Sequence, residues 1–255
     1  MSKGTVDGTG RGEGAIAFAR LRSVTQARIG LGRAGHAEPT RESLDFQLAH
    51  ARARDAVHAA MDVDRIRSTL DGADTIEVSS RAGDRAMFLQ RPDLGRRLHQ
   101  RSRENLEHGA YDLALVIGDG LSARAVEAHA AAMVTKLRGQ LLDWTIAPVV
   151  LAHQSRVALA DEIGEALGAR LVVMLIGERP GLSAADSLGA YITWQPRVGR
   201  ADSERNCVSN IRPPHGLSYE QATDLIVWLL KEAKRRGVTG VALKDTRTQA
   251  LPSPE

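Results

Sequence analysis

Residues 170–194, RLVVMLIGERPGLSAADSLGAYITW, decide the fold of this chain. The stretch begins with an uninterrupted apolar run, Leu171 to Gly177, made mostly of valine, leucine and isoleucine. A run without polar alternation is typical of a strand buried on both faces, as in a parallel sheet. It ends at GERPG, where Pro180 has no backbone N–H to donate. We therefore expect Glu178 and Arg179 at the carboxyl end of a buried strand, the edge where open α/β sheets bind ligands.

The sequence on either side of this strand alternates between strand patterns, glycine turns and amphipathic helices. Strands are predicted over 113–117, 145–152, 188–194 and 238–243. Helices are predicted over 122–138 and 157–167, and a last one begins at Ser218, where Gln221 completes a capping box. The connection 196–212, which contains Cys207, is polar. This alternation predicts an α/β fold with a doubly wound, Rossmann-like, mostly parallel sheet.

The N-terminal part has a different pattern. Residues 1–14 are rich in glycine and predict a disordered leader. Helices are expected over 16–29 and 41–61, and a hairpin is expected to join strands 75–79 and 86–90. We therefore predict an α-rich N-terminal domain over 15–109, a Rossmann-like domain over 110–246 and a tail over 247–255.

Composition limits the class of protein. The 255 residues are 43% apolar and 25% charged, as in globular proteins that bury a core. No apolar run approaches the ~18 residues of a membrane helix, and the first residues lack the apolar core of a signal peptide. The single cysteine excludes an internal disulfide and favours a reducing compartment. We expect a cytoplasmic protein.

Two stretches of the sequence suggest functions of their own, dinucleotide binding and nucleic-acid binding. Residues 118–123, GDGLSA, match the relaxed dinucleotide fingerprint G-x-G-x-x-A and predict a stand-alone NAD(P) oxidoreductase. Against this, Asp119 puts a carboxylate where a pyrophosphate must approach, and the next strand ends in Ala152-His153 rather than in an acid. The arginines of residues 91–103 could bind nucleic acid, but Glu104 and Glu107 follow closely. We interpret this segment as a charged interface and expect no nucleic-acid partner.

The residues alone leave the role of two candidates open. Glu178 could bind a ligand, accept backbone N–H bonds within its own loop, or pair with Arg179. Cys207 is most simply a small buried side chain, since a nucleophile would need a paired histidine such as His215. The cysteine and histidine spacing predicts no metal site.

Five stretches together resemble the small (light) subunit of ethanolamine ammonia-lyase, in the right order and over nearly all of residues 16–243. These stretches are LGRAG (31–35), LQRPDLGRRL (89–98), GDGLS (118–122), GERPGL (177–182) and CVSNI (207–211). The order and spacing of the motifs carry the resemblance, because no single one of them is specific.

This resemblance implies an adenosylcobalamin-dependent carbon–nitrogen lyase that converts ethanolamine to acetaldehyde and ammonia through an adenosyl radical. It implies a large catalytic subunit as partner, with the small subunit closing over the cobalamin at their interface. The cofactor would then carry the hard chemistry, which agrees with the lack of a catalytic set in this chain. By motif, the cobalamin contacts fall on Glu178 and Cys207, and through a looser match on Val157.

Two features qualify the resemblance. The cobalamin signature D-x-H-x-x-G is absent, as expected of a family that binds the cofactor base-on. Family members that enter a bacterial microcompartment can carry an amphipathic N-terminal helix, whereas residues 1–14 cannot form one. Encapsulation therefore stays open, beside a free cytoplasmic location.

Overall fold

The computed structural model describes residue 18 and residues 20–247. The predicted leader (1–14) and all but the first residue of the predicted tail lie outside these residues. The chain divides into two compact units, Met1–Arg54 with Gly181–Ala184, and Asp55–Pro180 with Ala185–Glu255. The predicted domain boundary near residue 110 stays a prediction.

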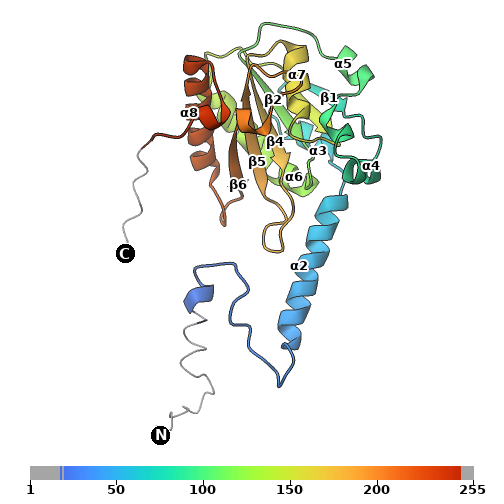
Figure 1. The fold of residues 1–255 in the computed structure, drawn as a ribbon, viewed down its shortest axis with the longest axis vertical. Coiled ribbons are helices and arrows are strands. Elements are labelled where there is room, and N and C mark those ends of the chain that lie inside the picture. The colour runs from blue at the N-terminus through green and yellow to red at the C-terminus, as the bar shows by residue number, and fades with distance from the viewer. Residues whose placement is uncertain (1–17, 19, 248–255) are drawn as a thin grey trace. The chain divides into compact units, whose positions relative to one another are not determined.

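Within the described residues, six strands form one mixed sheet in the order β1-β3-β2-β4-β5-β6 (Figure 1). The strands are β1 (Thr75–Ser79), β2 (Leu113–Gly118), β3 (Val149–His153), β4 (Leu171–Gly177), β5 (Leu188–Trp194) and β6 (Arg205–Ile211). The pairings among β1, β2, β3 and β4 are parallel, and β5 runs antiparallel to both β4 and β6. The α/β class is thus confirmed, while the doubly wound Rossmann-like topology stays a prediction.

The strand predicted from the apolar run, β4, is buried at every residue. Alternate side chains enter two separate hydrophobic cores, because successive residues of a strand point to opposite faces. Leu171, Val173 and Leu175 belong to one core, and Val172 and Met174 to the other. This explains why the run has no polar alternation.

Helices cover both faces of the sheet. The labelled helices of the described residues, not all of which pack on the sheet, are α2 (Thr40–His58), α3 (Val63–Ser68), α4 (Arg85–Gln90), α5 (Gln100–Glu104), α6 (Ala123–Gln140), α7 (Leu159–Leu167) and α8 (Tyr219–Arg236). Helices α6 and α8 pack on the face whose core contains Leu171, Val173 and Leu175. Helix α7 packs on the opposite face, against the core that contains Val172 and Met174.

Short-range signals set the ends of these helices. Ser122 caps α6, accepting a hydrogen bond from Ala125 N at 3.3 Å, and Ser218 and Gln221 form the predicted capping box of α8. Gly168 and Gly237 end α7 and α8 in the left-handed conformation, which glycine adopts without strain. The predicted capping box of α8 is thus confirmed.

The predicted hairpin over residues 75–79 and 86–90 is wrong. The first segment is β1, but it pairs in parallel with β3. The second is helix α4, which begins after Asp84 because this side chain accepts a hydrogen bond from Met87 N at 2.7 Å. A five-residue apolar segment fits a strand and a short helix equally well, and here the cap decides.

Two further segments differ from the prediction. The polar connection 196–212 contains the edge strand β6, and the predicted strand 238–243 is instead a short 3₁₀ turn, Gly240–Ala242. Gly240 has a φ of 79° and packs against the carbonyl of Ser203, so the chain turns where a strand would have to extend.

The unit that contains residues 1–54 is described from residue 18. Its helical segment ends at Arg22, well before the predicted end near residue 29. Helix α2 begins at Thr40 and ends at His58, three residues before the predicted end. Of its residues only Ala56 is buried, and Leu44 and Leu48 of the predicted apolar stripe are exposed.

Candidate functional site

The three residues that the sequence singles out, Val157, Glu178 and Cys207, line two adjoining pockets. One pocket, of about 390 Å³, contains Val157 and Cys207 in its wall. The other, of about 410 Å³, contains Val157 and Glu178. Both pockets share Arg156, Val157 and Tyr191, so the three candidates surround one continuous surface.

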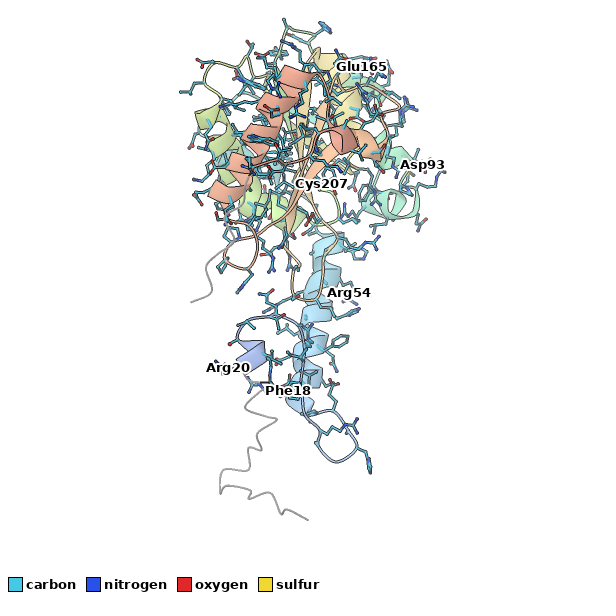
Figure 2. The ribbon with its side chains drawn as sticks, turned by 60° about the vertical axis from the view of Figure 1, so that its left-hand side comes forward. Phe18, Arg20, Arg54, Asp93, Glu165 and Cys207 are labelled. Carbon is cyan, nitrogen blue, oxygen red and sulfur yellow. The ribbon has the colours of Figure 1, made fainter. Side chains whose placement is uncertain are left out.

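The sheet topology explains why these residues meet. Glu178 follows the carboxyl end of β4, and Val157 lies in the turn between β3 and α7, two residues before that helix begins. Cys207 (labelled in Figure 2) lies on β6, and its partner in the strand register is Tyr191 on β5. Since α6 and α8 pack on the other face of β5 and β6, the face that carries Cys207 is exposed.

The Glu178 carboxylate is held by donors from two segments. Ser187 Oγ donates to Oε2 at 2.6 Å, Ser209 Oγ donates to Oε1, and Asn210 N donates to Oε2 at 3.3 Å. The partners are thus the serine at the end of its own loop and two residues of β6, rather than Arg179. The carboxylate is fixed at the wall of the pocket, with both oxygens already accepting hydrogen bonds.

The surroundings of Cys207 do not favour a nucleophile. Packing around the sulfur raises the pKa of the Cys207 thiol, and the charge of Glu178 adds to this, although a hydrogen bond with Tyr191 opposes it. In the described part of the chain the side-chain partner of Cys207 is this tyrosine and not His215. At neutral pH the group is therefore a thiol, which is the weakly reactive form. The expected burial of Cys207 is wrong, because β6 lies at the sheet edge and exposes it.

The loop after β2 has a structural role. Asp119 is buried, and its carboxylate accepts hydrogen bonds from Gln154 N at 2.8 Å and Ser155 N at 2.9 Å. It also lies 3.6 Å from Arg85 Nη1. This carboxylate joins the β2 loop to the loop after β3, and so orients the turn that carries Val157.

Glycines in the same loop permit close packing. Gly120 has a φ of 54°, and a Cβ placed there would lie 2.3 Å from the carbonyl oxygen of Gly177. The loop therefore packs directly on the end of β4. Together with the inward-facing Asp119, this packing accounts for the G-x-G pattern without a dinucleotide.

Arginine side chains give the site its charge. Arg156 and Arg85 lie against the ring of the buried Phe88, with their guanidinium carbons 4.2 and 4.6 Å from its centroid. Burial lowers the pKa of Arg156, and the neighbouring positive charges of Arg85, Arg96 and Arg179 lower it further, although the charge of Asp119 opposes this. Arg96, Arg156 and Arg179 line the two pockets and give their surface positive charge.

A buried ion pair supports the pocket on the other side. Arg205 Nη1 lies 2.7 Å from Asp161 Oδ1, and both side chains are only 2% exposed. The Arg205 guanidinium also donates to the carbonyl of Arg200 at 2.7 Å. This pair joins β6 to the first turn of α7, so it fixes Cys207 relative to Val157.

Sequence reasoning missed Arg156, Tyr191, Ser187 and Ser209 as parts of this surface. Arg156 precedes Val157 directly, and Ser209 lies two residues after Cys207, on the same side of β6. Including the neighbours of each predicted residue in the turn or on the same side of the strand would have found Arg156 and Ser209. Tyr191 is found only through the register of β5 with β6, and Ser187 only through its hydrogen bond to Glu178.

A metal site and a membrane-spanning helix both find no support in the described residues. Among the described residues, no group of three or more histidine, cysteine or acidic side chains could hold a metal ion. None of the described helices combines the length and the apolar character that a membrane crossing requires.

Comparison with known proteins gives a consistent result. Residues 16–244 match the model of the family described as ethanolamine ammonia-lyase light chain (EutC). A relative from Bradyrhizobium diazoefficiens is 57% identical over 240 residues, covering 91% of this chain and 92% of its own length. Relatives from Pseudomonas aeruginosa (53% identical; 91% and 88% covered) and Xanthomonas campestris pv. campestris (51% identical; 92% and 90% covered) are similar to the same extent. All three bear the name ethanolamine ammonia-lyase small subunit.

Proposed function

This chain belongs to the ethanolamine ammonia-lyase light chain family, and from that membership we propose that it binds adenosylcobalamin, base-on, together with a large catalytic subunit. The assembly would convert ethanolamine to acetaldehyde and ammonia. We propose Val157, Glu178 and Cys207 as the residues of this chain that contact the cofactor. The observation that carries the proposal is that these three residues, far apart in the sequence, line one continuous surface.

The residues present fit a corrinoid. A corrin is a broad ring with an apolar face and a rim of amide side chains, so its site must offer apolar contact and hydrogen-bonding groups together. The two adjoining pockets, of about 390 and 410 Å³, provide a broad surface rather than a narrow cleft. Val157 and Tyr191 supply apolar contact, and the Glu178 carboxylate and the Arg156 guanidinium supply an acceptor and donors.

The side chains of this subunit would bind and orient rather than react. Glu178 is fixed by three hydrogen bonds, so it would present its carboxylate in one position without reorganising. Cys207 would contribute a neutral thiol, since its pKa is raised. When bound, adenosylcobalamin supplies the homolytic radical chemistry, and the large subunit would hold ethanolamine.

The name small subunit implies a large one. The exposed face of β6, which carries Cys207 and Ser209, is a surface that such a partner could close. Closure would exclude water from the cofactor, which protects reactive intermediates. We further propose a cytoplasmic location for the complex. Cell fractionation would show whether the complex is free there or associated with a bacterial microcompartment.

The experiment is co-expression of this chain with the large subunit from the same genome. Cobalamin binding is followed by visible absorbance for the complex and for each chain alone, and ammonia release from ethanolamine is assayed. We expect tight binding and turnover only with both chains. Failure of the chains to associate, or a complex that binds no corrinoid, would contradict the proposal.

A titration of the isolated chain with NADH serves as the comparison with the alternative function. A dinucleotide site of the Rossmann type needs no second subunit, so binding should appear with this chain alone. We expect no change in NADH fluorescence, because Asp119 and the packed glycines occupy the loop where the pyrophosphate would bind.

A further inference from the structure

Arg156 is held in place by Phe88 but forms no ion pair within the part of the chain that the structure describes. Its guanidinium lies 4.2 Å from the Phe88 ring centroid, and Nη2 donates to the carbonyl oxygen of Phe88 at 3.2 Å. Among the described residues, no carboxylate lies within ion-pair distance of it, and its Nε is buried without a partner. A guanidinium has five N–H donors, so most of the hydrogen-bonding capacity of Arg156 is unused.

The acidic groups around the two pockets are already engaged. Asp119 pairs with Arg85, Asp161 and Asp202 both lie near Arg205, and Glu178 accepts hydrogen bonds from Ser187, Ser209 and Asn210. Asp202 shares a pocket with Arg96 but lies 3.5 Å from Arg205 Nε, and no acid of the described residues lies within ion-pair distance of Arg96, Arg156 or Arg179.

Three arginines at this surface therefore have no ion-pair partner among the described residues. Arg96 and Arg156 line the pocket that contains Cys207, and Arg156 and Arg179 line the pocket that contains Glu178. The positive charges of Arg85, Arg96 and Arg179 all act on Arg156, and of the acids only Asp119 opposes them. Like charges kept together without an anion are unfavourable, so their arrangement points to a ligand that supplies one.

The N-terminus of the nearby helix α7 does not contribute anion-binding groups to this site. Although α7 begins beside Val157, its first N–H groups are used within the chain, since Leu159 N donates to the Arg156 carbonyl at 2.9 Å and Ala160 N to that of Val157 at 3.2 Å. The first turn of α7 also carries Asp161 and Glu162, which offset the positive helix end.

We propose that Arg96, Arg156 and Arg179 form a binding site for a single organic phosphate, the phosphodiester in the nucleotide loop of the cofactor. This inference rests on the proposed function. Guanidinium groups bind phosphate oxygens through paired hydrogen bonds, and Arg156, already oriented by Phe88, would lose little conformational entropy on binding. The site would thus select corrinoids that carry this phosphate over those that lack it.

The experiment compares three corrinoids on the two-chain complex. Cobinamide lacks both the phosphate and the lower base, cobinamide phosphate restores the phosphate, and cyanocobalamin has the complete loop. Dissociation constants are measured by visible absorbance for the wild type and for Arg156→Gln. We expect the variant to bind cyanocobalamin and cobinamide phosphate about tenfold to a hundredfold more weakly, the effect typical of a lost charge-assisted hydrogen bond. Its affinity for cobinamide should be unchanged.

Further variants keep the test decisive if Arg156→Gln does not fold. Arg96→Gln and Arg179→Gln alter exposed side chains and should give the same selective loss to a smaller degree. Arg235→Gln is the matched control, because this arginine pairs with Glu232 on α8 and lines neither pocket. We expect the control to bind all three corrinoids as the wild type does.

Three results would overturn the inference, and they are distinguishable. Equal weakening for all three corrinoids would mean that the arginines contact the ring rather than the phosphate. Weaker association of the two subunits without corrinoid would mean that they bind an acidic surface of the partner. A wild-type complex that binds cyanocobalamin no better than cobinamide would exclude a phosphate site while the proposed function stands. Absence of all corrinoid binding would instead remove the proposed function itself.

Discussion

The carboxylate of Glu178, directly after β4, accepts a hydrogen bond from the hydroxyl group of Ser209 on β6, two strands away in the sheet. The contact passes over β5 at Gly189, where a Cβ would lie 2.9 Å from Glu178 Oε1. A larger residue at position 189 would therefore displace the carboxylate. This contact joins the loop after the central strand to the edge strand that carries Cys207.

Glu178→Gln should weaken cobalamin binding by the two-chain complex and leave the fold intact. The amide keeps one acceptor oxygen but turns its NH₂ group toward donors, so one or more of the three hydrogen bonds is lost. We expect a loss of about 1–3 kcal/mol in the free energy of unfolding, measured by urea denaturation, and a parallel loss of cofactor affinity. Unchanged affinity would leave Glu178 with only the role of joining the loop to β6.

Gly120→Ala should destabilise the chain by about 3 kcal/mol or more, because it adds a Cβ 2.3 Å from a carbonyl oxygen at a positive φ. Gly139→Ala is the matched control, since position 139 lies in α6 with no heavy atom within 4 Å of its Cβ. Alanine there should stabilise by about 0.5–1 kcal/mol. Thermal unfolding of both variants would show whether the first glycine is needed for packing.

Arg205→Met should destabilise the chain by about 3–5 kcal/mol, because it leaves the buried Asp161 carboxylate without its partner. Burial already raises the pKa of Asp161, against the effect of Arg205. The double variant Arg205→Met, Asp161→Leu should recover most of this loss, since it removes both charges. A double-mutant cycle by urea denaturation measures the coupling, and independent effects would contradict the ion pair.

The stability of the chain should depend on His129 below neutral pH. Burial lowers the pKa of His129 below its ordinary 6.5. The charge of Arg212 also lowers this pKa, whereas Asp186 raises it. His129 Nδ1 lies 2.8 Å from the Tyr219 hydroxyl. Because the unfolded histidine takes up a proton first, the free energy of unfolding should fall as the pH drops through about 6.5. That contribution is fully present above this pH.

The check is urea denaturation of the wild type and of His129→Asn at several pH values between about 5 and 8. The amide of asparagine can replace Nδ1 toward Tyr219 but does not titrate. The difference in unfolding free energy between the two proteins should therefore shrink or reverse as the pH falls. A difference independent of pH would show that His129 titrates alike in both states.

Cys207 should react slowly with iodoacetamide at neutral pH although it is exposed. Its raised pKa keeps the thiolate population small, and the chain contains only one cysteine, so mass spectrometry reports this site alone. We expect faster labelling in the urea-unfolded chain than in the native one, and further protection in the complex with cobalamin. Native labelling faster than in urea would indicate an activated thiol.

Local patterns were sufficient where they report burial or a cap. The apolar run 171–177 predicted a strand buried on both faces, and β4 lies between two cores. The capping box of Ser218 and Gln221 predicted the start of α8. Such signals depend on residues close in sequence, which is why they could be found without coordinates.

Edge strands and short segments required more than a local pattern. Strand β6 has one face toward the core and one exposed, and its exposed residues Cys207 and Ser209 make it look like a loop. Residues 85–90 are too short for a period to distinguish strand from helix, and the Asp84 cap decided between them.

The sequence by itself determined the family, the α/β class, the central strand and the three candidate residues. Only the tertiary structure decided that Val157, Glu178 and Cys207 line one surface, that Ser209 and Ser187 hold Glu178, and that Arg156 has no counter-ion among the described residues. The physical reason is that the signals for burial and helix capping come from residues close together in the sequence, whereas a site depends on strand order and register. Those follow from how the whole sheet packs, so side chains far apart in sequence meet only when it has formed.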